Sequence, residues 1–372
     1  MKHRPLRFGI ALFAVFTLVA AACGDDDDEV GAGASDTTTA SEPADEPSGD
    51  EPSGPVDFTA CQVTDTGGVD DDSFNETAYA GLTRAESELG TEIAFLESTS
   101  EADFAPNIDA LLDQDCDLII TIGFLLGDAT ESAAIDNPDA DFAIVDFAYE
   151  DPPDNVRQLT FATDEAAFLA GYLAAGMTES GTVGTYGGIK LPSVTIFMTG
   201  FEAGIVHYNE ENGTAVELEG WSTEAGDGLF TGDFEDQTKG RSTTEQLLDT
   251  GADIIMPVAG PVGLGSIEAV RADGGDAKLI WVDSDGCVSV PGACDLFLTS
   301  VQKKMDVAVF ETIETAVNGD FEGGLYSGTL ENEGVDIAPF NEFEDEVPPE
   351  LAAELDELRQ QIIDGDLEVT LG

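Results

Sequence analysis

One short stretch near the start of the chain gathers side chains that can recognise a small polar ligand. Asp65, Phe74 and Asn75 supply a carboxylate, an aromatic ring and an amide. The stretch follows an apolar run at 58–63 and precedes a helical pattern from residue 77, which predicts a strand-to-helix loop. Such loops lie at the carboxyl ends of strands in α/β sheets, where ligands bind. We therefore expect the ligand to bind here.

These residues also have structural interpretations. Phe74 can be a core residue or a hydrophobic staple of the following helix. Asp65, like Asp283 at a later strand end, can cap the helix that follows it. The three aspartates at 70–72 are expected to face solvent, although together with Asp65 they could hold a hard cation such as calcium or magnesium. Their spacing does not match an EF-hand loop, so no metal site is predicted.

The pattern from residue 56 onward predicts an α/β protein. The chain has 372 residues, of which 42% are hydrophobic, and this length favours two lobes because single cores stop growing near about 250–300 residues. Strands are expected at 58–64, 92–97, 117–122, 142–146, 157–161, 182–187, 215–219, 253–258, 279–283 and 326–330. Helices are expected at 76–89, 104–114, 126–135, 165–177, 194–210, 239–250, 264–273, 302–318 and 349–364.

This alternation favours parallel sheets with crossover helices in both lobes. We expect the first lobe to comprise 56–163 with about 302–325, and the second to comprise 164–301 with about 326–372. The chain would then cross between the lobes more than once, as in a cleft-type binding protein that closes around its ligand by hinge motion.

The first 55 residues are predicted to form an export signal followed by a tether. Residues 1–22 combine basic side chains with an apolar run, the layout of a secretory signal peptide. The sequence Leu-Val-Ala-Ala-Ala-Cys-Gly resembles a bacterial lipobox, in which Cys23 is diacylated and becomes the mature N-terminus; an ordinary signal peptide is the alternative. Residues 23–55 are acidic and poor in large apolar side chains, which predicts a disordered tether. The protein would be lipid-anchored on the extracytoplasmic face of the cell membrane.

The composition excludes several classes of partner. The formal net charge is −64, a field that repels nucleic acid and anionic lipid. Adaptation to salt is the simplest interpretation of this acidity, and it does not identify the ligand. The chain has only two histidines and no Cys-x-x-Cys pair, so a zinc site is not expected.

Four cysteines remain if Cys23 is lipidated. An even number in an exported protein suggests disulfides, with three possible pairings. Cys287 and Cys294 enclose a short loop and are expected to form a local bridge, which leaves Cys61 and Cys116 as a second pair if their strands are neighbours. Four buried free thiols are the alternative.

Several segments, in order along 57–372, resemble the basic membrane protein (BMP) family. They are 67–75, 165–175, 187–188, 200–204, 259–260, 282–285 and 299–303. Members of this family are substrate-binding lipoproteins of ABC importers, and those characterised bind purine nucleosides. The resemblance implies a type I periplasmic-binding-protein-like fold, with two doubly wound lobes joined by a multi-crossover hinge. It also implies a non-enzymatic function without a cofactor.

The resemblance implies a site built from both lobes. Its ligand-binding residues would be Asp65, Phe74, Asn75, Asp146, Met256, Gly263, Asp283 and Lys303. The family usually has a phenylalanine where Met256 aligns, so the purine would lie between an aromatic ring and a thioether. Gly286 also departs from the family pattern, which leaves one wall of the cleft undefined.

Each implied role has a chemical basis. Phe74 can stack on the base, Asn75 can bind the base edge, and Asp283 can accept hydrogen bonds from the ribose hydroxyls. A structural alternative for Lys303 is that it neutralises nearby acidic groups.

Three functions follow as hypotheses. The first is a monomeric binding protein that delivers a purine nucleoside to an ABC permease and ATPase. The second is a ligand-sensing receptor subunit with the same fold. The third is a metal-dependent nucleoside hydrolase, against which stand the absence of a catalytic histidine pattern and of a nucleophile elbow.

Overall fold

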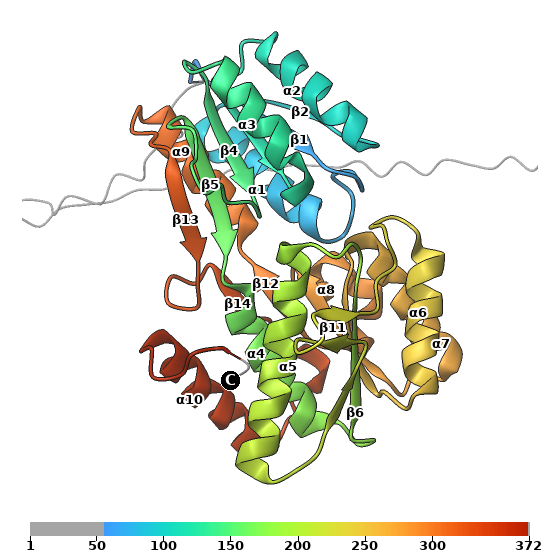
Figure 1. Ribbon diagram of the computed structural model, residues 1–372. Coiled ribbons are helices and arrows are strands. Elements are labelled where there is room, and N and C mark those ends of the chain that lie inside the picture. Colours follow the sequence, from blue (N-terminus) through green and yellow to red (C-terminus); the bar gives the residue numbers. More distant parts are fainter. Residues whose placement is uncertain (1–55, 371–372) are drawn as a thin grey trace, which may run out of the picture. The chain divides into compact units, whose positions relative to one another are not determined.

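The computed structural model describes residues 56–370. The predicted signal peptide, the predicted lipidation site Cys23 and the predicted acidic tether lie outside the described residues. Two six-stranded sheets form the framework (Figure 1). We call each sheet with its covering helices a lobe, the first containing β1 and the second containing β6.

The first sheet is parallel throughout, with the order β13-β5-β4-β3-β1-β2. Its strands are β1 (Thr59–Thr64), β2 (Glu92–Leu96), β3 (Leu118–Ile122), β4 (Asp141–Val145), β5 (Val156–Phe161) and β13 (Gly324–Gly328). The central β3 is apolar apart from one threonine and is buried along its whole length. This pattern is typical of a parallel strand that is covered on both faces.

Different helix pairs cover the two faces of this sheet. The helices are α1 (Phe74–Leu89), α2 (Phe104–Leu112), α3 (Gly127–Asp136) and α9 (Met305–Val317). Successive side chains of a strand point to opposite faces. Ala60 and Leu118 therefore lie in the core shared with α1 and α9, whereas Cys61 and Ile119 lie in the core shared with α2 and α3.

The second sheet has the order β14-β12-β11-β10-β6-β7 and is parallel except for β14, which is antiparallel to β12. Its strands are β6 (Thr182–Gly187), β7 (Glu217–Glu219), β10 (Ile254–Val258), β11 (Lys278–Asp283), β12 (Phe297–Lys303) and β14 (Val335–Ile337). The lobe's helices are α4 (Thr163–Met177), α5 (Pro192–Asn212), α6 (Gln237–Asp249), α7 (Leu264–Asp273), α8 (Gly286–Ser289) and α10 (Pro349–Ile363). Helices α4 and α5 pack together, as do α6 and α7.

The remaining elements are short. A hairpin is formed by β8 (Trp221–Ser222) and β9 (Asp227–Gly228). The 3₁₀ turns are η1 (Glu101–Asp103), η2 (Phe124–Leu126), η3 (Gly260–Gly263), η4 (Pro291–Leu296) and η5 (Asn341–Phe343).

The described chain passes between the lobes after β5, after β12 and after β13. The sequence does not predict β12, and the helix expected at 302–318 begins only at Met305. A short apolar run such as Phe297–Val301 reads equally well as a buried strand or a helix. The strand expected at 326–330 is β13, which pairs with β5 in the first sheet, so the last crossing follows Gly328.

Two disulfides join neighbouring segments. Cys61 in β1 is bonded to Cys116, just before β3, with their Cα atoms 6.0 Å apart. This pairing follows from the lateral contact of β1 with β3. Cys287 in α8 is bonded to Cys294 in η4.

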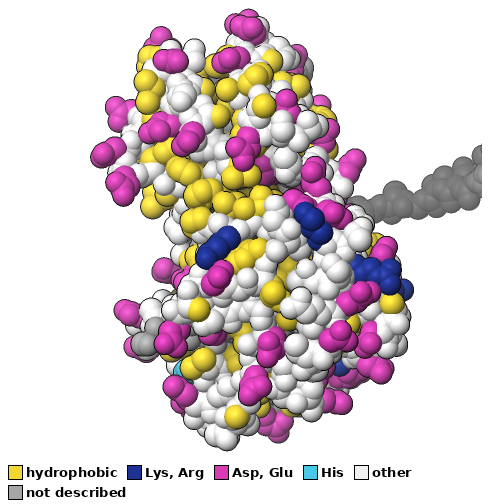
Figure 2. Space-filling model, turned by 45° about the vertical axis from the view of Figure 1, so that its right-hand side comes forward, with side chains coloured by type: hydrophobic (Ala, Val, Ile, Leu, Met, Phe, Trp, Pro, Cys, Tyr) yellow, Lys and Arg dark blue, Asp and Glu magenta, His cyan; other side chains and the backbone are white. Residues whose placement is uncertain are grey.

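The described surface is acidic. Figure 2 shows Asp and Glu side chains spread over the visible face, with Lys and Arg at only a few places. Within residues 56–370, no helix is long and apolar enough to cross a membrane.

Candidate ligand-binding site

A cavity that is partly open to solvent lies between the carboxyl-end loops of the two sheets. Six of the eight predicted ligand-binding residues line it: Asp65, Phe74, Asn75, Asp146, Asp283 and Lys303. They come from four strand ends and from the first turn of α1. The topology therefore brings together side chains that are more than two hundred residues apart in the sequence.

Asp71 organises the loop that opens the site. Its Oδ1 accepts hydrogen bonds from the amides of Ser73 and Glu76, both at 3.0 Å, and its Oδ2 accepts one from the amide of Asn75 at 2.9 Å. Burial raises the pKa of Asp71 to about 6, although these amides oppose the shift. The prediction that all of 70–72 face solvent is wrong for Asp71, which is buried, caps α1 and lines the cavity.

Asp65 and Asn75 form a second polar unit. The Asn75 Nδ2 donates to Asp65 Oδ1 at 3.0 Å and to Asp71 Oδ2 at 3.3 Å. Burial raises the pKa of Asp65 to about 8, and neighbouring carboxylates add to the shift. Gly123 makes room for this carboxyl, because a Cβ at that position would lie 2.4 Å from Asp65 Oδ2. Asp65 therefore does not cap α1; it lies at the polar side of the cavity.

Lys303 joins the lobes at the end of β12. Its Nζ lies 2.6 Å from Asp146 Oδ2 and 3.1 Å from Asp283 Oδ1. Burial disfavours its charge, but these two carboxylates outweigh burial and leave the pKa of Lys303 raised. Its Nζ also lies 4.7 Å from the ring centroid of Phe74. Lys303 is thus the counter-ion of two buried carboxylates and also lines the cavity, and its contact with the ligand stays a prediction.

The two carboxylates that hold Lys303 occupy equivalent positions in the lobes. Asp146 follows β4 and Asp283 ends β11, and their φ angles are 63° and 69°. A left-handed backbone is uncommon for residues other than glycine and often marks a functional constraint. Ser73 Oγ, from the first lobe, donates to Asp283 Oδ2 at 3.1 Å. Asp283 therefore helps to connect the lobes as well as lining the cavity.

Met256 and Gly263 lie outside the cavity lining, contrary to the alignment that placed them at the ligand. Met256 is fully buried in β10, and its side chain belongs to the core of the second lobe. Gly263 packs beneath the ring of Trp281, where an added Cβ would lie 3.1 Å from that ring. The second lobe instead lines the cavity with Phe197, Phe234, Gly260 and other apolar or backbone groups.

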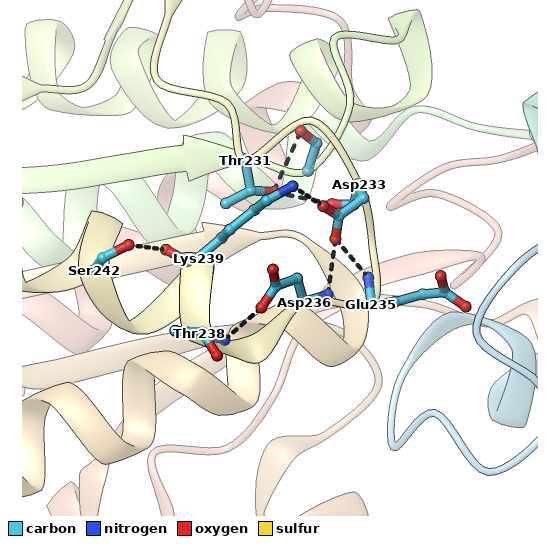
Figure 3. A network of polar contacts seen from close by, with 8 residues as sticks. Thr231, Asp233, Glu235, Asp236, Thr238, Lys239 and Ser242 are labelled. Carbon is cyan, nitrogen blue, oxygen red and sulfur yellow. Dashed lines mark hydrogen bonds and ion pairs between the residues drawn. The ribbon is translucent and has the colours of Figure 1, made fainter.

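Phe234 is the aromatic residue that sequence reasoning missed. It lies in the polar loop before α6, where no periodic pattern points to it. A network shown in Figure 3 holds this loop: Asp233 Oδ1 accepts from the amides of Glu235 and Asp236 at 3.0 and 2.7 Å, and Asp233 Oδ2 pairs with Lys239. Gly188 leaves space for the ring, because a Cβ there would lie 2.3 Å from Phe234 Cδ1.

The chemistry of the lining favours binding. It includes carboxylates, one amide, one ammonium group and aromatic rings, but neither histidine nor cysteine. Among the residues that the structure describes, no cluster of His, Cys, Asp or Glu is arranged to hold a metal ion. The lining thus offers stacking surfaces and hydrogen-bonding groups.

Comparisons with known proteins identify the family of the chain. A family model described as Bmp, ABC transporter substrate-binding protein PnrA-like, matches residues 58–369. A CD4+ T-cell-stimulating antigen from Listeria innocua is 32% identical over 99% of each chain. An ABC transporter nucleoside-binding protein BmpA from Lactococcus lactis is 31% identical over 84% of this chain and 89% of its own. A solved ABC transporter solute-binding protein from Aeropyrum pernix is 28% identical, with a TM-score of 0.76, over 84% of this chain and 92% of that one.

Proposed function

Because the chain belongs to the Bmp family of ABC transporter substrate-binding proteins, we propose that it captures a purine nucleoside between its two lobes. The protein is a binding protein and not an enzyme. The choice of a purine nucleoside as the ligand rests on one observation. Phe74 and Phe234 line the same cavity from opposite lobes, beside the polar unit of Asp65 and Asn75.

A purine nucleoside matches each part of this lining. Its base is a flat ring that can stack on Phe74 and Phe234, and each aromatic contact contributes about 0.5–1.5 kcal/mol beyond the burial of area. The edge of the base can bond to Asp65 and Asn75. The ribose hydroxyls can donate to Asp146 or Asp283, and bonds to charged groups contribute roughly 1.5–3 kcal/mol each.

The cellular setting follows from the family and from the first residues. Lipidation at Cys23 would hold the protein on the extracytoplasmic face of the membrane, and 23–55 would act as the tether. The protein would act as a monomer that hands the nucleoside to an ABC permease with its ATPase. A strain that lacks the protein should then lose uptake of the labelled nucleoside. Persistent uptake with loss of a cellular response would favour the receptor hypothesis instead.

Calorimetry tests the ligand directly. The mature chain carrying Cys23→Ser, which prevents lipidation, should be titrated with adenosine, guanosine, inosine, uridine, ribose and a 2′-deoxynucleoside. We expect purine nucleosides to bind more tightly than uridine or ribose, and the deoxynucleoside to bind more weakly. Absence of binding by every purine nucleoside would contradict the proposal and would leave the family assignment intact.

A further inference from the structure

The loop before α1 bonds directly to the second lobe. The indole Nε1 of Trp281, in β11, donates to the backbone carbonyl of Asp72 at 3.3 Å. Ser73 Oγ lies 3.1 Å from Asp283 Oδ2 and 3.3 Å from the carbonyl oxygen of Val282. Asp72, Ser73, Trp281 and Val282 lie outside the cavity lining. We call these contacts the interlobe latch; the bond between Trp281 and Asp72 lies wholly outside the site of the ligand.

The second-lobe side of the latch is rigid. Trp281 is fully buried, and its ring centroid lies 5.3 Å from that of Phe297. Gly263 and Gly286 leave space for this side chain, because an added Cβ would lie 3.1 Å from the Trp281 ring at Gly263 and 2.9 Å from the Trp281 Cβ at Gly286. Close-packed neighbours hold an aromatic ring in one orientation. The N–H group of Trp281 is thus fixed toward the first lobe.

The first-lobe side of the latch is held by Asp71. The Asp71 carboxylate accepts hydrogen bonds from the amides of Ser73 and of two residues in the first turn of α1, which ties the loop to that helix. Asp72 has a φ angle of 54°, in the left-handed region that is uncommon for residues other than glycine. Such a conformation persists where the surrounding contacts determine it. The hydrogen bond from Trp281 is one of these contacts.

The latch forms only when the two lobes are close together. Asp72 and Trp281 are 209 residues apart in the sequence, and neither belongs to a segment that crosses between the lobes. Hinge motion that separates the lobes would break the latch and leave each of its sides intact. A direct contact of this kind stabilises the closed form whether or not a ligand is bound. One hydrogen bond is worth a factor of about 2–10 in the equilibrium between the open and closed forms.

We propose that the interlobe latch sets the affinity of the protein for its ligand from outside the cavity, with Trp281 and Ser73 as positioning residues that raise the population of the closed form. A ligand that binds only the closed form has an apparent dissociation constant equal to its intrinsic value divided by the population of that form. Loss of the latch should therefore weaken the binding of every ligand of the cavity by one common factor. Loss of a side chain that touches the base would change the affinities of different nucleosides unequally. The effect on affinity rests on the proposed function, whereas the effect on lobe closure does not.

Trp281 itself can report on lobe closure without any ligand. The only other tryptophan is Trp221, whose Nε1 donates within its own lobe to Thr223 Oγ1 at 3.0 Å, so Trp221→Phe leaves Trp281 as the single fluorophore. Acrylamide quenching should be measured on the mature Cys23→Ser chain that carries Trp221→Phe. Adding Asp72→Val should at least double the quenching constant and shift the emission to the red, because a β-branched residue strongly disfavours the left-handed turn. Asp72→Gly is the matched control, since glycine keeps this turn without strain.

Trp281→Phe tests the effect of the latch on binding. It removes the indole N–H and keeps an aromatic ring in the core, and Trp221→Phe is the same change at a tryptophan that makes no bond to the other lobe. Calorimetry of both variants with adenosine, guanosine and inosine should show a two- to tenfold loss of affinity in Trp281→Phe, by the same factor for each nucleoside. Trp221→Phe should change each affinity by less than twofold. Urea unfolding confirms that the compared proteins are folded.

The two experiments fail in different ways. Equal quenching in Asp72→Val and Asp72→Gly would show that the latch does not hold the lobes together, and would overturn the proposal. Equal affinities in Trp281→Phe and Trp221→Phe, or losses in Trp281→Phe that differ between the nucleosides, would also overturn it. Failure of every purine nucleoside to bind would contradict the proposed function, and the quenching measurement would still decide whether the latch closes the lobes.

Discussion

The two walls of the cavity differ in how they are built. The polar wall, contributed by the first lobe, contains Asp65, Asp71 and Asn75, which bond to one another and to the first turn of α1. The apolar wall consists of Phe197, Phe234 and backbone around Gly260 from the second lobe, whereas Asp283 and Lys303 of the same lobe connect the two walls. The polar wall can select hydrogen-bonding patterns, whereas the apolar wall supplies surface area. We therefore expect changes in the polar wall to affect mainly specificity and changes in the apolar wall to affect mainly affinity.

Removal of Lys303, whose ion pairs connect the two walls, should have the largest effect on stability. Lys303→Met leaves Asp146 and Asp283 buried without their cation, and loss of one partner of a buried ion pair costs about 3–5 kcal/mol. We expect the free energy of unfolding in urea to fall by this amount. Lys304→Met is the control, since its side chain is partly exposed and bonds only to Gln302 among the described residues. Equal effects in both variants would contradict the role given to Lys303.

Truncation of an aromatic residue in the apolar wall should weaken ligand binding with little change in the stability of the protein. Phe234→Ala removes a half-buried ring from a loop, so binding of the nucleoside should weaken by at least tenfold while the midpoint of urea unfolding changes little. Phe74→Ala is the matched change on the opposite side. Both rings pack against the core, but Phe74 belongs to the first turn of α1 and lies beside the Lys303 ammonium group, so this variant should lose more stability as well as affinity. Calorimetry and urea unfolding should be measured for both variants. Equal losses of affinity and stability in the two would contradict the difference between the walls.

Loss of the ion pair that holds the loop of Phe234 should have the smallest effect on affinity. Lys239→Met breaks the exposed pair with Asp233, and such pairs are worth at most about 1 kcal/mol. We expect a two- to fivefold loss of affinity and a weaker dependence of affinity on salt. Arg241→Met, on the same helix, removes a pair with Glu245 that lies outside the loop of Phe234, and it should leave binding unchanged. An unchanged affinity in Lys239→Met would show that the loop holds Phe234 without this pair.

The polar wall is largely predictable from the sequence because its residues adjoin strong local signals. Asp65 follows an apolar run and Asn75 lies at the start of an amphipathic helix, so the positions of both in a strand-to-helix connection follow from periodicity. The burial of Asp71 does not follow, since an aspartate among aspartates in a turn is usually solvated. Its three amide partners become visible only when the loop is folded.

The apolar wall is harder to predict. Phe234 stands alone in a polar loop, and its approach to the site depends on contacts with Gly188. Met256, which aligns with a phenylalanine of the family, lies in the middle of β10 and outside the cavity lining, whereas the lining comes from strand ends and the loops and helix turns beyond them. The strand β12 is also missed, although its last residue, Lys303, is identified by the resemblance to the family.

Because two carboxylates already pair with Lys303, its charge is not free to bind an anionic ligand. Lys303 is the single cation among the described lining residues, and Asp146 and Asp283 already occupy it. A phosphate ester brings about −1.5 to −2 charge at neutral pH and would meet further carboxylates with no cation to receive it. We therefore expect the site to bind uncharged nucleosides in preference to nucleotides, because the phosphate group would be repelled.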